Sequence, residues 1–434
     1  MNGITNEMLK AFRNGYENDR TAVTNTAACA RTELKDLAFL PMSAAKLNGS
    51  FSVEIETHGI TAQQKSGRCW AFAVLNILRE QCAEKTGMKE FYLSGNYIAF
   101  YDKLEKANNA LELAIANAEK PLDDRMMEYL LNGFHDGGYW NMAVDLVKKY
   151  GIVPAHVMPE TYQSEHTEQF MRLLNNLVRK DISVLRKVCS EGKDPQPVKR
   201  EMMAEIYKME CIAFGEPVNS FDFEYRTAQG TFHRDVQITP LEFYEKYTNH
   251  NLDEYVMVTC EPTEHKHMDT LHQFHYIGSM ADSDIRFLNI PIEELEDLCI
   301  RQLKDLEPVW FSNDAGAYGD RQCGVWDPDS FDYEGLMGGV LFSMNKEDRL
   351  NYKVSSGTHA MILVGVNLDE SGRPDRWKIE NSWGGDLGKN GIFVCSESYF
   401  REYVYEAIIQ KKYLTEKHLA LLDTEPEVLQ PWQK

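Results

Sequence analysis

The sequence predicts an α+β fold in which helices dominate the first half of the chain and strands become frequent in the second. Between residues 165 and 214 the apolar side chains recur at helical spacing, whereas from about Thr239 the pattern is mixed. Residues 359–366 form an apolar, branched run that is typical of a buried strand. With 434 residues, 43% of them hydrophobic, the chain is long enough for two or three packed domains.

The first part of the chain is predicted to be an extension followed by helices. Residues 1–50 contain short amphipathic stretches, and we expect them to form an N-terminal extension that wraps around the outside. Residues 51–160 form a helical unit, in which a helix with a broad apolar stripe runs from Cys69 to about Lys85. The region near 104–130 begins rich in Ala, Leu and Glu, and is predicted to be a helical insertion.

The remainder divides into a second helical insertion, a strand-rich unit and a C-terminal arm. Residues 161–238 are predicted to be mainly helical, with a break at Pro195 and Pro197 because proline interrupts a helix. Residues 239–412 contain the strands, and residues 413–434 form the arm. The elements predicted within the strand-rich unit are a helix at 292–306 and strands at 308–312, 359–366 and 377–380.

Residues 63–72 place a single thiol where a helix begins, with the Gln63 amide six positions upstream of it. A thiol attacks a carbonyl only as the thiolate, and the positive end of a helix dipole lowers the pKa of a thiol in the first turn. Cys69 therefore suits a nucleophile at the rim of a cleft. A cysteine before an apolar helix is more often a small buried side chain, so this motif needs support from other segments.

Two later segments supply that support. His359 opens an apolar strand, and Asn381 follows a second strand within a Glu-Asn-Ser-Trp-Gly motif. This order of motifs resembles that of the papain-like cysteine peptidases, whose Cys-His-Asn arrangement is a known variant of the catalytic triad. The roles that the resemblance implies are nucleophile for Cys69, base for His359, imidazole-orienting residue for Asn381 and oxyanion donor for Gln63.

Three further residues match positions near the substrate in that family. Gly137 and Gly138 resemble the paired glycines on which the substrate backbone forms hydrogen bonds, and glycine permits such a close approach. Taken alone, the pair is more often an ordinary turn. Trp383 corresponds to the ring that covers the hydrogen bond between His359 and Asn381.

The motifs are most similar to those of one branch, the bleomycin hydrolases and bacterial aminopeptidases C. His359 lies 290 positions after Cys69, about twice the 130 to 150 of secreted papain-like enzymes. No cysteine stands three positions before Cys69, and the resemblance extends from about Phe51 to the C-terminus. It implies a papain-like two-lobe fold, with a helical lobe, a β-barrel lobe and large helical insertions. It also implies a homohexamer whose active sites face an inner channel, and the insertions offer apolar faces for such contacts.

The activity implied by the resemblance is that of a cysteine aminopeptidase. It would hydrolyse peptide bonds at the N-terminal end of peptides through a thioester on Cys69, with bleomycin-hydrolase-like amide hydrolysis as a further activity. In this branch the C-terminal arm enters the cleft, and its terminal carboxylate faces the substrate amine. Here the arm resembles the family as far as Trp432 and ends about five residues short, which is roughly 17 Å of extended chain. The Lys434 ammonium would repel an amine.

Several alternatives therefore stay open. The short arm allows release of dipeptides or action as an endopeptidase. A papain-like transferase, or a hydrolase of non-peptide amides, would use the same acyl-enzyme chemistry. An inactive papain-like scaffold is a remote alternative, because it has no need to keep Gln63, Cys69, His359 and Asn381 together.

Composition bears on compartment and partners. The formal net charge is −21, from 67 acidic and 46 basic residues, and there is no basic block, so nucleic-acid binding is not expected. Nine scattered cysteines without a Cys-x-x-Cys pair indicate a reducing compartment. No apolar run suits a secretory signal or a membrane span, and we expect a cytoplasmic enzyme that acts on peptides.

Four histidines gather between residues 264 and 275, namely His265, His267, His272 and His275. Their spacing matches no defined ligand pattern. We therefore expect neither a metal nor another cofactor, and interpret the segment as a surface loop that leads into a strand.

Overall fold

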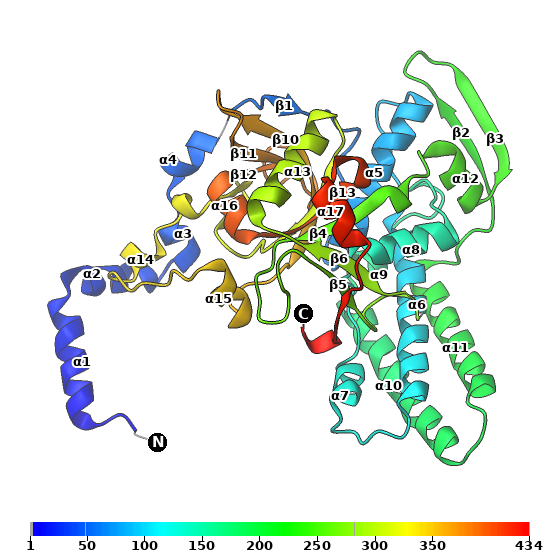
Figure 1. Cartoon of the computed structure of the whole chain (residues 1–434), viewed down its shortest axis with the longest axis horizontal. Coiled ribbons are helices and arrows are strands. Elements are labelled where there is room, and N and C mark those ends of the chain that lie inside the picture. Colours follow the sequence, from blue (N-terminus) through cyan, green and yellow to red (C-terminus); the bar gives the residue numbers. More distant parts are fainter. Residues whose placement is uncertain (1–2, 48, 282, 434) are drawn as a thin grey trace.

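A computed structural model describes residues 3–47, 49–281 and 283–433. The α+β class predicted from the sequence is confirmed, because a helical half and a strand half lie side by side (Figure 1). The helices of the helical half are α5 (Cys69–Thr86), α6 (Gly95–Ala116), α7 (Arg125–Asn132), α8 (Trp140–Tyr150), α9 (Tyr162–Glu165), α10 (Glu168–Ser190), α11 (Gln196–Phe214) and α12 (Pro240–Tyr247). A hairpin of β2 (Phe221–Arg226) and β3 (Phe232–Ile238) stands at the edge of this half.

Twelve strands of the described residues form one sheet, in the order β14-β5-β6-β4-β13-β7-β10-β11-β12-β9-β8, with β1 paired to β10. The strands are β1 (Val53–Glu54), β4 (Tyr255–Thr259), β5 (Thr270–Phe274), β6 (Ile285–Asn289), β7 (Val309–Asn313), β8 (Gly319–Asp320), β9 (Val325–Trp326), β10 (His359–Leu368), β11 (Pro374–Glu380), β12 (Ile392–Ser396), β13 (Val404–Gln410) and β14 (Glu427–Leu429). The helices of this half are α13 (Ile292–Lys304), α14 (Tyr333–Leu336), α15 (Lys346–Asn351), α16 (Glu397–Tyr403) and α17 (Glu416–Leu422). The 3₁₀ turns are Ala45–Leu47, Leu252–Glu254, Pro328–Ser330, Lys411–Tyr413 and Pro431–Gln433.

Helix α5 joins the two halves. Nearly all of its side chains are buried, as its apolar stripe predicts, and the Trp310 indole N–H on β7 donates a hydrogen bond to the Trp70 carbonyl at 3.1 Å. The Arg79 guanidinium pairs with the Glu380 carboxylate at 2.8 Å, and both side chains are almost completely buried. Because separating a buried ion pair leaves an uncompensated charge in the interior, this contact fixes α5 against the end of β11.

The N-terminal extension has two parts. Helices α3 (Leu34–Ala38) and α4 (Pro41–Ala44) lie on the strand half, where the Leu40 N–H donates to the Ser330 carbonyl at 2.8 Å. Helices α1 (Asn6–Asn18) and α2 (Arg20–Cys29) have no buried residues. Asn25 on α2 donates to the Leu336 carbonyl of α14 at 2.8 Å, and α1 projects away from the body (Figure 1). The extension therefore wraps around the body only in part.

The predicted helices and strands agree closely with the structure, with two clear differences. The region 161–238, predicted to be mainly helical, ends in the hairpin of β2 and β3. The helix expected near 104–117 begins at Gly95, because the Ser94 side chain caps its N-terminus by accepting a hydrogen bond from the Tyr97 N–H. The break expected at the two prolines separates α10 from α11. Among the described residues, no helix combines the length and apolar character needed to cross a bilayer.

Candidate active site

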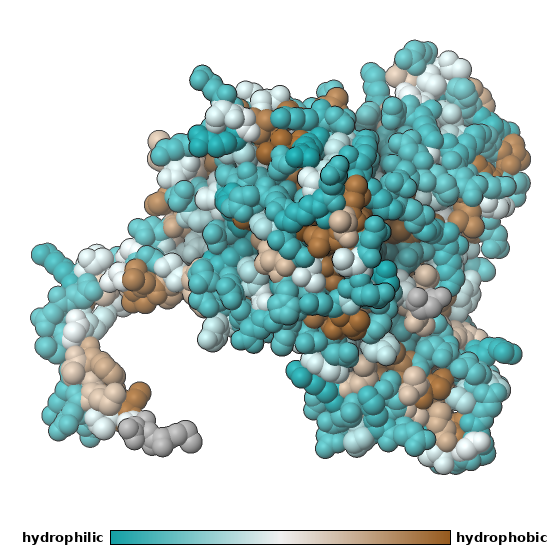
Figure 2. All heavy atoms as spheres, viewed as in Figure 1, coloured by the Kyte–Doolittle hydropathy of each residue, from teal (hydrophilic) through white to brown (hydrophobic). Residues whose placement is uncertain are grey.

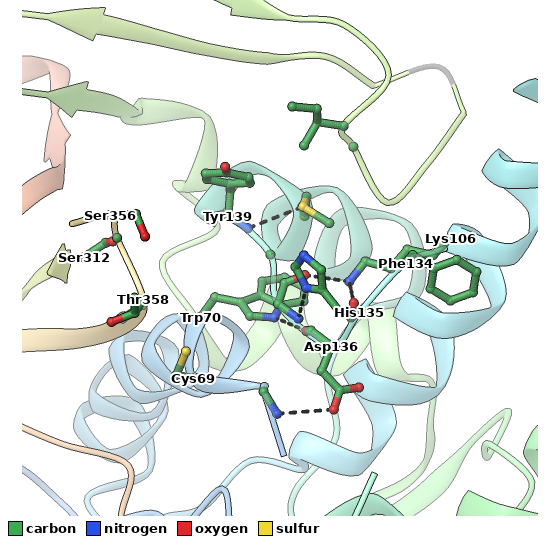
Figure 3. Close-up of a pocket in the computed structure, with 18 of the residues that line it drawn as sticks. Cys69, Trp70, Lys106, Phe134, His135, Asp136, Tyr139, Ser312, Ser356 and Thr358 are labelled. Atoms are coloured by element: carbon green, nitrogen blue, oxygen red, sulfur yellow. Dashed lines mark hydrogen bonds between the residues drawn. The ribbon is translucent and has the colours of Figure 1, made fainter. Parts of the chain in front are cut away.

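A pocket of about 1020 Å³ lies where the N-terminus of α5 faces the strand half. Five of the seven predicted site residues line this pocket. The other two, Asn381 and Trp383, contact His359 from outside the pocket. The lining members are Gln63, Cys69, Gly137, Gly138 and His359. Figure 3 shows the Cys69 sulfur pointing into this pocket, with Thr358 on one side and Trp70 on the other.

Cys69 is the first residue of α5. Burial raises the pKa of its thiol, while hydrogen bonds from the backbone of Ala360, Trp70 and Cys69 itself act in the opposite direction by favouring the thiolate. The helix terminus and the start of β10 therefore supply the groups that would stabilise a negative sulfur.

His359 is the first residue of β10, and Asn381 follows the last residue of β11. The His359 Nε2 atom lies 2.8 Å from Asn381 Oδ1, and the Trp383 ring stacks on the imidazole with centroids 4.6 Å apart. Burial lowers the pKa of His359 to about 4, and the Arg321 charge adds to this, whereas the Asn381 hydrogen bond raises it. The amide and the indole hold the ring in one orientation and shield it from water.

Gln63 is tied to the segment after Asn381. Its backbone N–H donates to the Ser382 carbonyl at 2.8 Å, and the Ser382 hydroxyl donates to Gln63 Oε1, also at 2.8 Å. The Gln63 Nε2 atom donates to the Ser66 carbonyl at 2.6 Å. Since Nε2 carries two hydrogens, one remains for a substrate oxygen.

Gly137 and Gly138 form one wall of the pocket, which we call the glycine wall. A Cβ at Gly138 would lie 2.6 Å from the Trp70 ring, and a Cβ at Gly137 would lie 2.7 Å from the His135 ring. Both distances are shorter than van der Waals contact, so any side chain here would displace an aromatic ring. Packing against the buried Trp70 ring therefore requires glycine at position 138, whereas the exposed His135 ring can move to admit a side chain at position 137.

Buried charges that sequence reasoning missed hold the glycine wall in place. The Lys106 ammonium on α6 donates to the carbonyls of Gly137 at 2.9 Å and His135 at 3.0 Å, and pairs with Asp102 at 2.8 Å. The Asp136 carboxylate accepts from the Gly67 N–H at 3.2 Å. In the sequence, these charges could have been noticed as lysines within the predicted helix that later proves to be buried, α6.

A second charged group in the pocket was also missed. Glu261, Lys266 and Glu406, which we call the acidic cluster, all line the pocket and are at most 9% exposed. Lys266 forms an ion pair with Glu261. Burial and the neighbouring Glu261 raise the pKa of Glu406 to about 8. In the sequence, Glu406 could have been noticed as a glutamate within an otherwise largely apolar stretch, residues 404–410.

The histidine-rich segment does not gather around one point. His267 Nδ1 lies 2.8 Å from a Glu427 oxygen on β14, and His275 Nδ1 lies 2.7 Å from Asp284. Among the described residues, no group of three or more His, Cys, Asp or Glu side chains is arranged to hold a metal ion. These histidines instead contact the C-terminal arm and the neighbouring loop.

A helical half and a strand half that meet at a Cys-His-Asn pocket define a papain-like fold. The chain belongs to the Peptidase C1-like family, whose model matches residues 3–434. The crystal structure of PepW from Lactobacillus rhamnosis HN001 is similar to this one with a TM-score of 0.96 and 37% identity, over 99% of this chain and 98% of that chain.

Curated relatives are similar over almost their whole length. Aminopeptidase C of Listeria innocua is 38% identical over 431 residues, which cover 99% of this chain and 97% of the relative. Aminopeptidase G of Lactobacillus delbrueckii subsp. lactis is 40% identical over 432 residues, which cover 99% of this chain and 98% of the relative. The alignments with these relatives therefore include the helical insertions and the C-terminal arm.

Proposed function

We propose that this cysteine aminopeptidase uses Cys69 as nucleophile and His359 as general base, with Asn381 orienting the imidazole and Gln63 stabilising the oxyanion. The observation that carries this assignment is the 2.8 Å contact between His359 and Asn381 beside a cysteine at the first position of a helix. Peptides are the substrates that the family membership implies.

In this mechanism the thiol proton moves to His359, and the Cys69 sulfur attacks the carbonyl carbon of the scissile bond. The carbonyl oxygen becomes negative and takes a hydrogen bond from Gln63 Nε2. The imidazolium then gives its proton to the leaving amine, which leaves a thioester on Cys69. Water, deprotonated by His359, hydrolyses the thioester and restores the thiol.

The restriction to N-terminal ends has a structural basis in residues 276–281, which we call the bridging segment. This segment follows β5 in the strand half and contacts the helical half: Asn109 Nδ2 donates to the Gly278 carbonyl at 2.9 Å, and the Ser279 hydroxyl donates to Asp102 at 2.8 Å. Gly278 also lines the pocket. The bridging segment thus spans one end of the pocket, and a substrate chain that lies on the glycine wall cannot run past it.

The C-terminal arm supports this barrier from outside. Strand β14 pairs with β5, and the Arg125 guanidinium on α7 lies 4.9 Å from the centre of the Trp432 ring. None of the described residues of the arm lines the pocket. The arm would therefore restrict the cleft by holding the bridging segment, not by filling the cleft, and Lys434, whose charge we considered, lies outside the described residues.

The test is to follow the digestion of one unmodified decapeptide by mass spectrometry. Stepwise shortening from the N-terminus, by one or two residues at a time, is expected because the pocket is closed at one end. Internal fragments at early times would contradict the proposal and favour an endopeptidase.

A companion test concerns the nucleophile. Cys69→Ser should keep the fold and abolish turnover, whereas Cys82→Ser should remain active, since Cys82 is buried within α5. Iodoacetamide should label Cys69, and a slow substrate added before the reagent should protect Cys69 from labelling. An active Cys69→Ser variant would overturn the assignment.

We also propose a cytoplasmic homo-oligomer, with a hexamer as the arrangement that the family resemblance implies. All nine cysteines carry free thiols, which supports a reducing compartment. The exposed, projecting helices α1 and α2 support contacts with further subunits. Amide hydrolysis of the bleomycin hydrolase type would use the same acyl-enzyme.

A further inference from the structure

The acidic cluster lies in the same pocket, but the mechanism above does not use it. Its place follows from the strand register. Ala360 on β10 faces Ser312 on β7, Ser312 faces Glu406 on β13, and Glu406 faces Thr259 on β4. Residues that face each other in antiparallel strands point to the same side of the sheet, and all four line the pocket. Glu406 therefore stands two strands from Ala360, whose backbone contacts the Cys69 sulfur.

The register gives an approximate distance. Neighbouring strands lie about 4.8 Å apart, so the backbone of Glu406 is roughly 10 Å from that of Ala360. In a bound peptide, the amine of the residue that supplies the scissile carbonyl lies only about 2.5 Å from that carbon, and one further residue adds about 3.5 Å. With a hydrogen bond of about 2.8 Å, the amine of the first residue spans about 5 Å and that of the second about 9 Å, so the second comes much closer to the Glu406 carboxylate.

The charges in the acidic cluster are not balanced. Two carboxylates face one ammonium, and that ammonium is held by Glu261 and lies over the Phe274 and Phe287 rings at 5.4 and 5.9 Å. Among the described residues, Glu406 takes part in no ion pair of its own, and on the sheet it has a hydrogen bond with the Ser312 side chain and faces Thr259. Without a full counter-charge Glu406 stays largely protonated below pH 8 while the pocket is empty. A cationic nitrogen within hydrogen-bond distance favours the ionised form, so the carboxyl group loses its proton and pairs with the cation.

Tyr139 links the acidic cluster to the glycine wall. Burial, and after it the charges of Glu406 and Glu261, raise the pKa of the Tyr139 hydroxyl. Tyr139 directly follows Gly138, and Figure 3 shows it at the side of the pocket that lies away from Cys69. The acidic cluster therefore lies within the reach of a substrate backbone that extends along the glycine wall away from Cys69.

We infer that Glu406, together with Glu261, binds a cationic nitrogen of the second substrate residue upstream of the scissile bond. The inference rests on the proposed function, because it uses the same pocket and the same closed end. The cationic nitrogen is either the free α-ammonium of a two-residue unit or the side chain of a lysine or arginine at that position. Glu406 is thus a specificity-determining residue, and the enzyme favours release of dipeptides that carry a free amine.

The test compares coumarin amides that differ in one charge. Gly-Leu-amide is paired with N-acetyl-Gly-Leu-amide, and N-acetyl-Arg-Leu-amide is paired with its citrulline analogue, which has the same shape without the charge. In the wild type, kcat/KM should be about tenfold or more higher for the cationic member of at least one pair, as expected for one charge-assisted hydrogen bond. Glu406→Gln should reduce that ratio to about one, mainly through KM.

Two variants serve as controls. Glu397→Gln changes a partly buried glutamate outside the pocket, which accepts a hydrogen bond from the Trp377 indole at 2.8 Å, and it should leave both ratios unchanged. Glu261→Gln removes the other carboxylate and should lower the same ratio, which keeps the inference testable if Glu406→Gln does not fold. If both pocket variants fold and keep the ratios of the wild type, the inference is wrong.

Leu-amide with a free amine separates this result from the proposed function. Its amine is too close to the scissile bond to reach Glu406, so the ratio of its kcat/KM to that of N-acetyl-Leu-amide should be the same in Glu406→Gln as in the wild type. A wild-type enzyme that cleaves only acetylated substrates would refute the aminopeptidase assignment, while the arginine and citrulline pair would still report on the acidic cluster.

Discussion

Burial acts on both members of the Cys69 and His359 pair in favour of their uncharged forms. It raises the pKa of the thiol and lowers that of the imidazole to about 4. A thiolate and an imidazolium side by side carry no net charge, and their attraction is strongest where water is excluded. The pair is therefore able to exchange a proton although each member alone resists ionisation.

A pH profile of alkylation tests that exchange. If His359 takes the proton, the rate at which iodoacetamide alkylates Cys69 should change by less than about tenfold between pH 9 and pH 6. In His359→Ala the thiol has no acceptor, and burial keeps its pKa raised, so the rate should fall about tenfold for each pH unit. Equal profiles for the two proteins would mean that the thiolate forms without His359.

Gln63 and Ser382 offer a graded test of the oxyanion donor. Gln63→Ala should lower kcat by about a hundredfold with little change in KM, because the hydrogen bond strengthens only in the transition state. Ser382→Ala removes the hydroxyl that orients the Gln63 amide and should lower kcat less, since the donor remains. A change confined to KM in Gln63→Ala would show that this side chain binds the ground state instead.

The raised pKa of Glu406 links stability to pH. Near pH 6 the folded protein keeps this carboxyl protonated, because its pKa is about 8, whereas in the unfolded chain it ionises near 4.5. The folded state then binds more protons, so stability falls as the pH rises from about 4.5 to 8. The charged or polar groups around Glu406 are Glu261, Lys266, Ser312 and Tyr139.

Glu406→Gln removes this titration while it keeps the shape of the side chain. Urea unfolding should show the variant gaining about 2 kcal/mol or more relative to the wild type between pH 5 and pH 9. A difference that does not depend on pH would mean that Glu406 is already ionised in the folded protein.

Residues with a local signal could be found from the sequence, and the others could not. Cys69 begins a helix, His359 begins a strand and Asn381 ends one, so the chemistry of each is visible in its own segment. Glu406 and Lys106 depend on partners from distant segments. Whether a charged side chain within a buried strand or helix faces a pocket is decided by tertiary packing, which spacing alone does not contain.

Among the helices, strands and loops, too, features set by neighbouring residues could be predicted, and features set by tertiary contacts could not. The N-terminus of α5 and the break between α10 and α11 follow from helix rules, because the responsible residues are neighbours in the chain. The bridging segment could not be predicted, since only its contacts with α6 and α7 show that it spans the pocket. The arm was expected in the cleft by resemblance, yet its described residues lie beside it.

Helix α6 offers an element-scale test of the glycine wall. Lys106→Met leaves the buried Asp102 carboxylate without its main counter-charge, and should lower the free energy of unfolding by about 3 kcal/mol. It should also raise KM, because the Gly137 and His135 carbonyls lose a donor. The double variant Asp102→Asn with Lys106→Met removes both charges and should recover part of the stability but not the KM. Equal stability of the two variants would contradict the role of the ion pair.

The exposed apolar side of α1 bears on the oligomeric state of the protein. Helix α1 has four apolar side chains along one side that are each more than 40% exposed: Met8, Leu9, Phe12 and Tyr16. Figure 2 shows apolar side chains on the projecting N-terminal helices. Helix α1 touches α2, where the Tyr16 and Thr26 hydroxyls lie 2.7 Å apart, but it buries none of its side chains. A helix of 13 residues in this state is marginal in water, so its apolar side needs a cover. Since no part of the described chain covers it, another subunit is the occupant that the proposed homo-oligomer provides.

Light scattering at micromolar concentration tests this assembly. The wild type should give a mass that is a multiple of the 49.9 kDa of one chain, and six chains are expected if the family resemblance holds. Phe12→Glu places a charge on the apolar side of α1 and should lower the mass, because burial of an unpaired charge is costly. Asn14→Glu adds the same charge on the opposite side of the helix and should not. If the wild type has the mass of a single chain, the proposal of a homo-oligomer is wrong. If both variants dissociate equally, the added charge alone is responsible, and the apolar side of α1 is not the contact between subunits.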